Sequence, residues 1–204
     1  MEKNNQGTDC YDAGKQNLRE SSFDIDSGSY IDLDEMLLSV QKDPLNPARV
    51  PFPQANDLDK ILDIVVSFDE NRKTSEQISK HLKFHGRQGD YYANAAVYLG
   101  LLARDQDSVG SFVLTGLGKE IKRCQIRICR TRILFVQLLK KPVFRSTLIL
   151  LRDYDYDVSK ISKDAIALII MENYIGYSLT TSKRRASTVI NWMNWACHNF
   201  KFKF

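Results

Sequence analysis

Four of the five prolines in this 204-residue chain lie within ten residues, at Pro44, Pro47, Pro51 and Pro53. Proline lacks a backbone N–H, and its ring disfavours helical conformation in the residue before it. The segment that contains them therefore cannot continue a helix and predicts an extended linker. We expect this linker to close an N-terminal arm, residues 1–50, and a folded body to follow it.

The arm is polar and acidic. Residues 1–50 carry five basic and ten acidic side chains, a composition that is typical of disordered segments. One apolar island, Ile31–Val40, has the spacing of a short amphipathic helix. We expect a largely disordered arm that contains this one short helix. In the alternative where the chain is an adaptor, the island would dock to a protein partner that offers a basic groove.

The composition excludes several classes of protein. Hydrophobic residues make up 43% of the chain and charged residues 26%, which indicates a globular protein. No apolar run approaches the length of a membrane span, and the N-terminus lacks the apolar core of a secretory signal, so we expect a cytoplasmic protein without membrane contact. The four cysteines form no CxxC pair, so we expect reduced thiols and no metal site. The phosphate-binding patterns GxxxxGK[ST] and GxGxxG do not occur, so we expect no nucleotide cofactor.

Residues 51–121 are predicted to form a first folded unit. Apolar residues at helical spacing predict helices that begin near Leu58 and Asp90, and a capping box at Thr74 begins a short helix between them. Apolar segments on both sides of a polar turn at 105–110 predict a β-hairpin. Three helices followed by a hairpin is the order of a winged helix.

The end of this hairpin has a distinctive pattern. Residues 112–118, Phe-Val-Leu-Thr-Gly-Leu-Gly, are similar to the aromatic-x-Leu-Thr-x-x-Gly segment that leaves the wing in many winged-helix regulators. There the threonine caps the next helix and the glycine permits close packing. Without that likeness, the segment still predicts a strand and a capped helix.

Residues 122–204 are predicted to repeat this plan as a second helix-turn-helix unit. A long helix is expected over 117–139. Three further helices are expected after Pro142, after Ser162 and from Thr180 or Thr181. The closing FKFKF would be a vestigial wing. The expected fold class is mainly α with a small β-wing, built as tandem winged-helix units.

Positive charge is concentrated in this second unit. Residues 121–204 carry sixteen basic and five acidic side chains. The run 122–145 holds eight Lys or Arg residues, and the run from Lys183 to the C-terminus holds five more, with no acidic residue in either. Such a distribution attracts polyanions, because each neutralised phosphate releases condensed counterions. The alternative is a solvated helix face, and we favour nucleic acid because aromatic residues accompany the second run.

The last helix is the best candidate for reading DNA. In a helix-turn-helix the second helix lies in the major groove, where Arg pairs with guanine, Asn with adenine, and Ser or Thr with phosphate or the thymine methyl group. We expect this helix to contact DNA through Lys183, Arg184, Arg185, Ser187, Thr188 and Asn191. Its core side is expected to be Val189, Trp192, Trp195 and Ala196.

The equivalent helix of the first unit is opened by side chains that also suit DNA contact. We expect contacts from Arg87, Gln88, Tyr91 and Asn94. An alternative stays open, in which Tyr91 and Tyr92 half-bury against the wing. This helix holds few cations, so alone it would bind weakly.

Residues 51–204 resemble the winged-helix DNA-reading module found with bacterial restriction systems and AAA-associated proteins. The segments that carry this likeness are PFPQANDLDKIL, TSEQISKHL, GRQGDYYANAAVYLGLL, FVLTGLGKEI and RRASTVINWMNW. The resemblance implies recognition of double-stranded DNA through the helices at 89–101 and 182–195, as part of a restriction or defence system. It leaves open whether the chain is a regulator, a specificity subunit or a fragment of a larger enzyme.

Two other functions remain as alternatives. The chain could be a protein-protein adaptor that docks through its acidic arm. It could also be a nuclease, because Glu120-Ile121-Lys122 has the spacing of half a restriction-type metal site, with Asp105 or Asp107 as the first acid. The tripeptide falls on a predicted helix with no central sheet to hold a metal, so we expect no catalytic residue in this chain.

Overall fold

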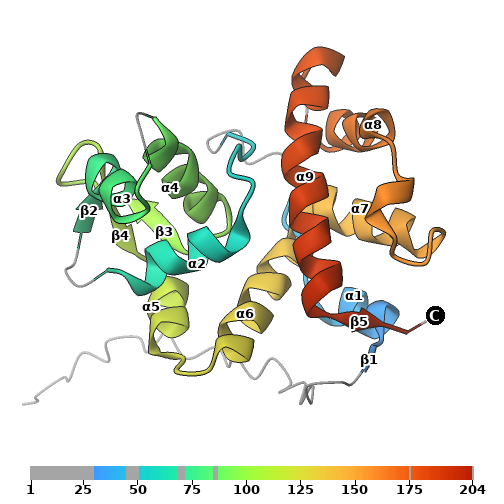
Figure 1. The fold of residues 1–204 in the computed structure, drawn as a ribbon, viewed down its shortest axis with the longest axis horizontal. Coiled ribbons are helices and arrows are strands. Elements are labelled where there is room, and N and C mark those ends of the chain that lie inside the picture. Colours follow the sequence, from blue (N-terminus) through green and yellow to red (C-terminus); the bar gives the residue numbers. More distant parts are fainter. Residues whose placement is uncertain (1–29, 45–50, 69–71, 85–86, 175, 204) are drawn as a thin grey trace, which may run out of the picture.

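The computed structural model describes residues 30–44, 51–68, 72–84, 87–174 and 176–203, and within these ranges the chain is mainly helical with small sheets (Figure 1). The first part of the body contains α2 (Leu58–Val66), β2 (Arg72–Thr74), α3 (Ser75–His81), α4 (Gln88–Tyr98), β3 (Leu102–Arg104), β4 (Ser111–Leu114) and α5 (Gly116–Arg123). The strands form one antiparallel sheet in the order β2-β4-β3. The three helices and the hairpin that the sequence predicts here are confirmed.

Side-chain caps fix where these helices begin. The Thr74 hydroxyl accepts a hydrogen bond from the Gln77 amide and the Gln77 side chain accepts one from the Thr74 amide, so the predicted capping box is confirmed. The Asp57 carboxylate caps α2 by accepting from the Lys60 amide, and the Thr115 hydroxyl caps α5 by accepting from the Gly118 amide. Local sequence therefore determines where α2, α3 and α5 begin, whereas α4 begins without a side-chain cap.

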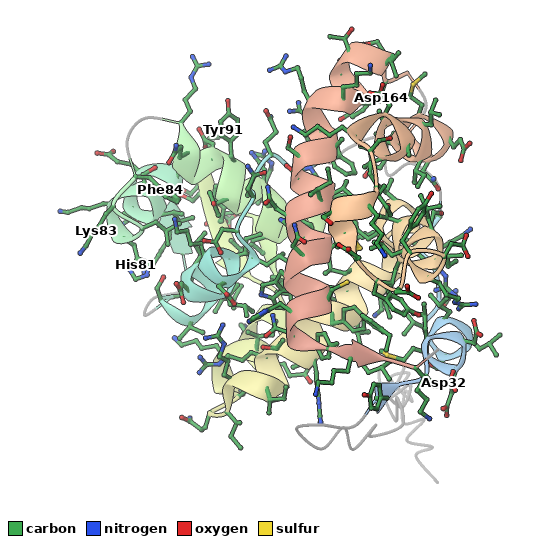
Figure 2. All side chains as sticks on the ribbon, turned by 45° about the vertical axis from the view of Figure 1, so that its right-hand side comes forward. Asp32, His81, Lys83, Phe84, Tyr91 and Asp164 are labelled. Atoms are coloured by element: carbon green, nitrogen blue, oxygen red, sulfur yellow. A yellow bond between two sulfur atoms is a disulfide. The ribbon has the colours of Figure 1, made fainter. Side chains whose placement is uncertain are left out.

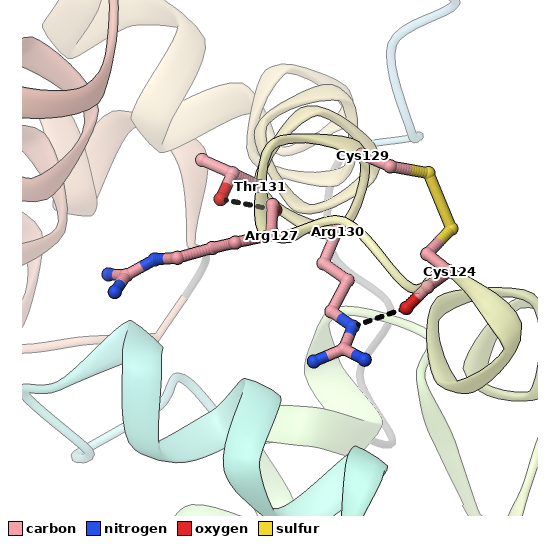
Figure 3. Close-up of a disulfide and its surroundings, with 5 residues drawn as sticks. All are labelled: Cys124, Arg127, Cys129, Arg130 and Thr131. Carbon is pink, nitrogen blue, oxygen red and sulfur yellow. Dashed lines mark hydrogen bonds between the residues drawn. A yellow bond between two sulfur atoms is a disulfide. The ribbon is translucent and has the colours of Figure 1, made fainter.

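The single long helix expected over 117–139 is wrong. The chain leaves helical conformation after α5, and three residues separate it from α6, which spans Arg127–Lys140. A disulfide between Cys124 and Cys129 links the end of α5 to the first turn of α6, and the Arg130 side chain donates a 2.8 Å hydrogen bond to the Cys124 carbonyl (Figure 3). The expectation of reduced thiols is therefore wrong for this pair.

The second part of the body contains α7 (Pro142–Arg152), the 3₁₀ turn η1 (Val158–Lys160), α8 (Lys163–Asn173), α9 (Leu179–Asn199) and β5 (Lys201–Phe202). The predicted cap of α8 at Ser162 is confirmed. The cap of α9 is Ser178 rather than Thr180 or Thr181, and its hydroxyl accepts from the Thr181 amide. The vestigial wing is also wrong, because β5 pairs in parallel with β1 (Tyr30–Ile31).

The segment 30–44 is packed against the second part of the body, which differs from the expected disordered arm. Its helix α1 (Leu33–Ser39) buries Leu33 and Met36. The Arg145 guanidinium donates hydrogen bonds to the carbonyls of Leu37 and Val40 at the end of α1. The apolar face that would dock to a partner in the adaptor alternative is thus buried within the chain. The rest of the arm, 1–29 and 45–50, lies outside the described residues.

We expect Arg145→Ala to detach this segment, lowering the free energy of unfolding by about 1.5–3 kcal/mol, because two carbonyl groups lose a charged donor. Proteolysis within 30–44 should accelerate in the variant. The matched control on the same helix is Arg152→Ala, which removes a 2.6 Å ion pair with Asp34. The Arg152 side chain is 39% exposed and the Asp34 side chain 71% exposed. That change should cost under about 1 kcal/mol, and equal effects of the two variants would contradict the assigned role of Arg145.

One hydrophobic core joins the two predicted units. Phe52, in the proline-containing linker, stacks on Phe144 of α7 with ring centroids 6.0 Å apart and meets Tyr174 edge-on at 5.1 Å. Its amide donates to the Tyr177 hydroxyl. The described part of the linker, taken from here on as residues 51–57 up to the start of α2, is therefore a packed part of the body, and it lies beside α9.

Candidate nucleic-acid interface

The helix α9 has one buried side and one solvent-exposed stripe. Its core residues include Val189, Trp192 and Ala196, each 0% exposed, which confirms the predicted core side, while Trp195 is half-buried. The exposed stripe contains Lys183, Arg184, Asn191, Asn194 and His198. The cations of this stripe lie in the first two turns of the helix.

An open pocket of about 600 Å³ lies beside these first turns. It is lined by Gln54, Asn56, Lys163, Thr180, Lys183, Arg184, Arg185, Ser187 and Thr188. Four of these residues are cations and the other five carry hydroxyl or amide groups. The structure therefore brings together five of the six residues predicted on this helix, and Asn191 lies outside the pocket.

The linker forms one wall of this pocket and is held there by hydrogen bonds to α9. The Thr188 hydroxyl donates to the Asn56 side-chain oxygen at 3.0 Å, and the Trp192 indole N–H donates to the Ala55 carbonyl at 2.8 Å. Thr188 is only 3% exposed. The pocket is thus recessed between the linker and α9, with Lys163 at the start of α8 on its edge.

The electrostatics of the pocket are positive. Lys183 pairs with Asp164 at 2.9 Å. Within the described parts of the chain, no carboxylate forms an ion pair with Lys163, Arg184 or Arg185. The Arg185 Nε is buried and has no hydrogen-bond acceptor. Such uncompensated donors favour an anion with several acceptor oxygens.

The other cation-rich run, 122–145, mostly holds the fold together. The Lys122 ammonium donates to the Phe68 carbonyl after the end of α2, and Arg127 pairs with Asp59 at 3.2 Å. Lys141 pairs with Asp43 at 2.6 Å. Arg130 and Arg145 bind backbone carbonyls, as described above. This run therefore offers fewer cations to a ligand than its composition indicates.

The four residues predicted on α4 lie apart from the pocket. Arg87 and Gln88 are exposed at the start of the helix, Tyr91 is 38% exposed, and Asn94 accepts a 2.7 Å hydrogen bond from Arg104 on β3. Figure 2 shows Tyr91 projecting from α4 on one side of α9 and Asp164 at the start of α8 on the other.

The open alternative for the two tyrosines of α4 is resolved by their exposure. Tyr92 is buried at 9% exposure against Phe84, whereas Tyr91 faces solvent. Burial, followed by the nearby charge of Asp57, raises the pKa of Tyr92. Tyr92 therefore belongs to the contact between α4 and the linker, and Tyr91 remains accessible to a ligand.

Sequence reasoning missed Gln54, Asn56, Lys163 and Thr180 as lining residues. The linker and the start of α8 are more than a hundred residues apart in sequence, so no local pattern connects them. The only signal was polar character in the linker, where Gln54 and Asn56 alternate with the apolar Pro53 and Ala55.

The structure also bears on a metal-dependent nuclease site at Glu120 and Lys122 and on the reactivity of the Cys197 thiol. Glu120 is exposed on α5, whereas the Lys122 ammonium is bound to the Phe68 carbonyl. In the residues that the structure describes, no group of three His, Cys, Asp or Glu side chains could hold a metal ion. Burial raises the pKa of Cys197 to about 11, so this thiol is protonated at neutral pH and is a weak nucleophile.

Comparison with known proteins assigns the chain to a family. Residues 60–201 match the family described as a domain of unknown function (DUF7226), and the chain belongs to this family. No curated protein and no solved structure matches the chain. A search of the described residues finds no helix long and apolar enough to cross a membrane.

Proposed function

We propose that this protein binds double-stranded DNA in a sequence-selective manner. The observation that carries the proposal is the α9 pocket, where four cations converge with no acidic side chain among the lining residues. A phosphodiester backbone is the polyanion that such a surface fits, because each neutralised phosphate releases counterions. The resemblance of residues 51–204 to DNA-reading modules is the only support for a role in a bacterial restriction or defence system.

The arrangement of the first part of the body supports the same proposal. The order α2-β2-α3-α4-β3-β4, with the sheet order β2-β4-β3, is the order that we expect of a winged helix, and it supports the proposal that this part of the chain is such a unit. In such a unit α4 would be the helix that enters the major groove. Gln88 and Tyr91 are exposed on this helix, where they could contact base edges or phosphates.

Fluorescence anisotropy with a labelled duplex of random sequence tests this function. We expect binding at low salt and a linear fall of log affinity with log salt concentration. The double change Arg184→Ala and Arg185→Ala should weaken binding at least tenfold. Lys201→Ala with Lys203→Ala removes the same charge beyond the opposite end of α9 and should change affinity far less.

Absence of salt-dependent binding by the wild-type protein would overturn the proposal. That result is also what a protein-protein adaptor would give. The adaptor alternative has little support from the arm, because the apolar face of α1 is already buried against the chain. Equal losses in the two double variants would show that binding follows net charge and not the pocket.

A further inference from the structure

We propose that the α9 pocket binds backbone phosphate groups of DNA and reads no base, so that sequence discrimination comes from other elements of the protein. This inference rests on the proposed function and changes the role that the sequence assigns to the helix. It makes α9 an anchoring helix whose cations set affinity and position.

The shape of the site does not suit insertion into a groove. A helix with its side chains is about 10–12 Å across, nearly the width of the major groove, so a reading helix needs free flanks. The helix α9 has neighbours on both flanks: α8 packs along one side, and the linker is hydrogen-bonded to the other through Thr188, near the middle of the helix, and Trp192, in its second half. What remains accessible is a narrow stripe and a recess.

A recess accepts a group that projects from its partner. Phosphates project from the duplex, whereas base edges lie at the floor of its grooves. The Arg184 side chain is exposed, and the Arg185 Nε is a buried donor without an acceptor. Together with Lys163 and the Thr180 hydroxyl, these donors match the oxygens of one or two adjacent phosphates.

Two of the polar side chains that would read bases on α9, Asn191 and Thr188, are already used within the protein. The Asn191 amide nitrogen, which would donate to adenine, donates instead to the Ser187 carbonyl at 2.8 Å. The Thr188 hydroxyl is buried and donates to Asn56. The cations of the pocket are therefore its main free donors, and cations alone bind every sequence of phosphates equally.

On α4, by contrast, polar side chains are free to contact a ligand. Gln88 and Tyr91 are exposed, and neither side chain forms a hydrogen bond to another described residue. A glutamine amide can pair with adenine through two hydrogen bonds. Gln88→Ala is thus the comparison variant for a contact that carries sequence information.

The experiment selects duplexes from a random pool with the full-length wild type, with Arg184→Ala plus Arg185→Ala, and with Gln88→Ala. The selected sequences and the salt dependence are then measured for each protein. We expect the double variant to prefer the same sequence as the wild type, with a similar fold-loss on all duplexes. Its salt slope should fall by about 0.9 for each phosphate contact removed. Gln88→Ala should keep the salt slope and relax the preference for at least one base pair.

A second variant separates phosphate contact from base contact at the same two positions. Arg184→Lys with Arg185→Lys keeps both charges but loses the planar pair of donors that recognises guanine. If the two side chains contact phosphates, the lysine variant should regain most of the affinity that the alanine variant loses. Recovery of binding with unchanged sequence preference supports the proposal.

Three results would overturn the inference. A changed base preference in either double variant would show that Arg184 or Arg185 reads sequence. An unchanged salt slope in the alanine variant would show that these side chains contact no phosphate. In both cases the wild type still binds DNA, so the proposed function stands. If the wild type binds no duplex at all, the proposed function itself fails, and this inference fails with it.

Discussion

Replacing Trp192 by alanine should lower the free energy of unfolding by about 3–5 kcal/mol, the range for removal of a fully buried large aromatic side chain. The indole is 0% exposed. It stacks on Phe144 with ring centroids 5.0 Å apart and contacts Tyr98 of α4 at 6.4 Å. Its N–H donates to the Ala55 carbonyl in the linker. One side chain thus joins α4, α7, α9 and the linker.

Urea-induced unfolding followed by far-ultraviolet circular dichroism measures this effect. Trp192→Phe is the matched control, because it keeps a ring against Phe144 while it removes the donor to the buried Ala55 carbonyl and part of the indole volume. It should cost about 1–3 kcal/mol. A loss below about 1 kcal/mol for Trp192→Ala would contradict the central position of this residue.

The same variant tests whether the body is one cooperative unit. The core is continuous across the two units that the sequence predicts, and the linker is packed within it. We therefore expect a single unfolding transition in the wild type and in Trp192→Ala. Two separated transitions would indicate that residues 51–121 and 122–204 fold independently.

The predictions from sequence succeeded where the cause lies within a few residues. The caps at Thr74 and Ser162 each depend on a side chain and an amide three positions later. The β-hairpin followed from two apolar segments around a polar turn. The core side of α9 followed from the periodicity of Val189, Trp192 and Ala196.

Two failures are local, namely the break between α5 and α6 and the cap of α9, and the others concern contacts between residues far apart in sequence. The break between α5 and α6 carries neither proline nor glycine, and the apolar periodicity on both sides hides it. The parallel pairing of β1 with β5 joins residues near opposite ends of the chain. Counting charges could not show that Lys141 pairs with Asp43 or that Arg145 binds the end of α1, because these partners lie in the acidic arm.

The candidate site was predicted in part for the same reason. The sequence identified the cations of α9 because they are adjacent, at Lys183, Arg184 and Arg185. It could not place Asn56 and Lys163 around them, since the pocket forms only when the linker and α8 pack against the helix. The recess that favours phosphate contact is a property of the tertiary structure.

Gly118→Ala should destabilise the protein by about 1–3 kcal/mol, the usual cost of forcing an extra carbon into a packed site. The α5 helix approaches the connection between α4 and β3 so closely here that a Cβ atom would overlap the Leu101 carbonyl oxygen and lie 3.0 Å from a Leu114 methyl group. The backbone cannot easily withdraw, because the Gly118 amide donates to the Thr115 hydroxyl, which itself donates to the Gly100 carbonyl at 2.7 Å. Close packing therefore explains the glycine that ends the segment 112–118.

The matched control for this change lies two residues earlier on the same helix. A Cβ at Gly116 would meet nothing within 4 Å, and the position is helical and exposed. Gly116→Ala should stabilise the protein by about 0.4–1 kcal/mol, because alanine restricts the unfolded chain more than glycine does. Urea-induced unfolding measures the change in the free energy of unfolding for both substitutions. Opposite signs would show that the contact with Leu101, and not helix propensity, causes the loss at Gly118. If both variants were stabilised, α5 could move away from the connection between α4 and β3 at little cost, and the close approach at Gly118 would not be a requirement of this fold.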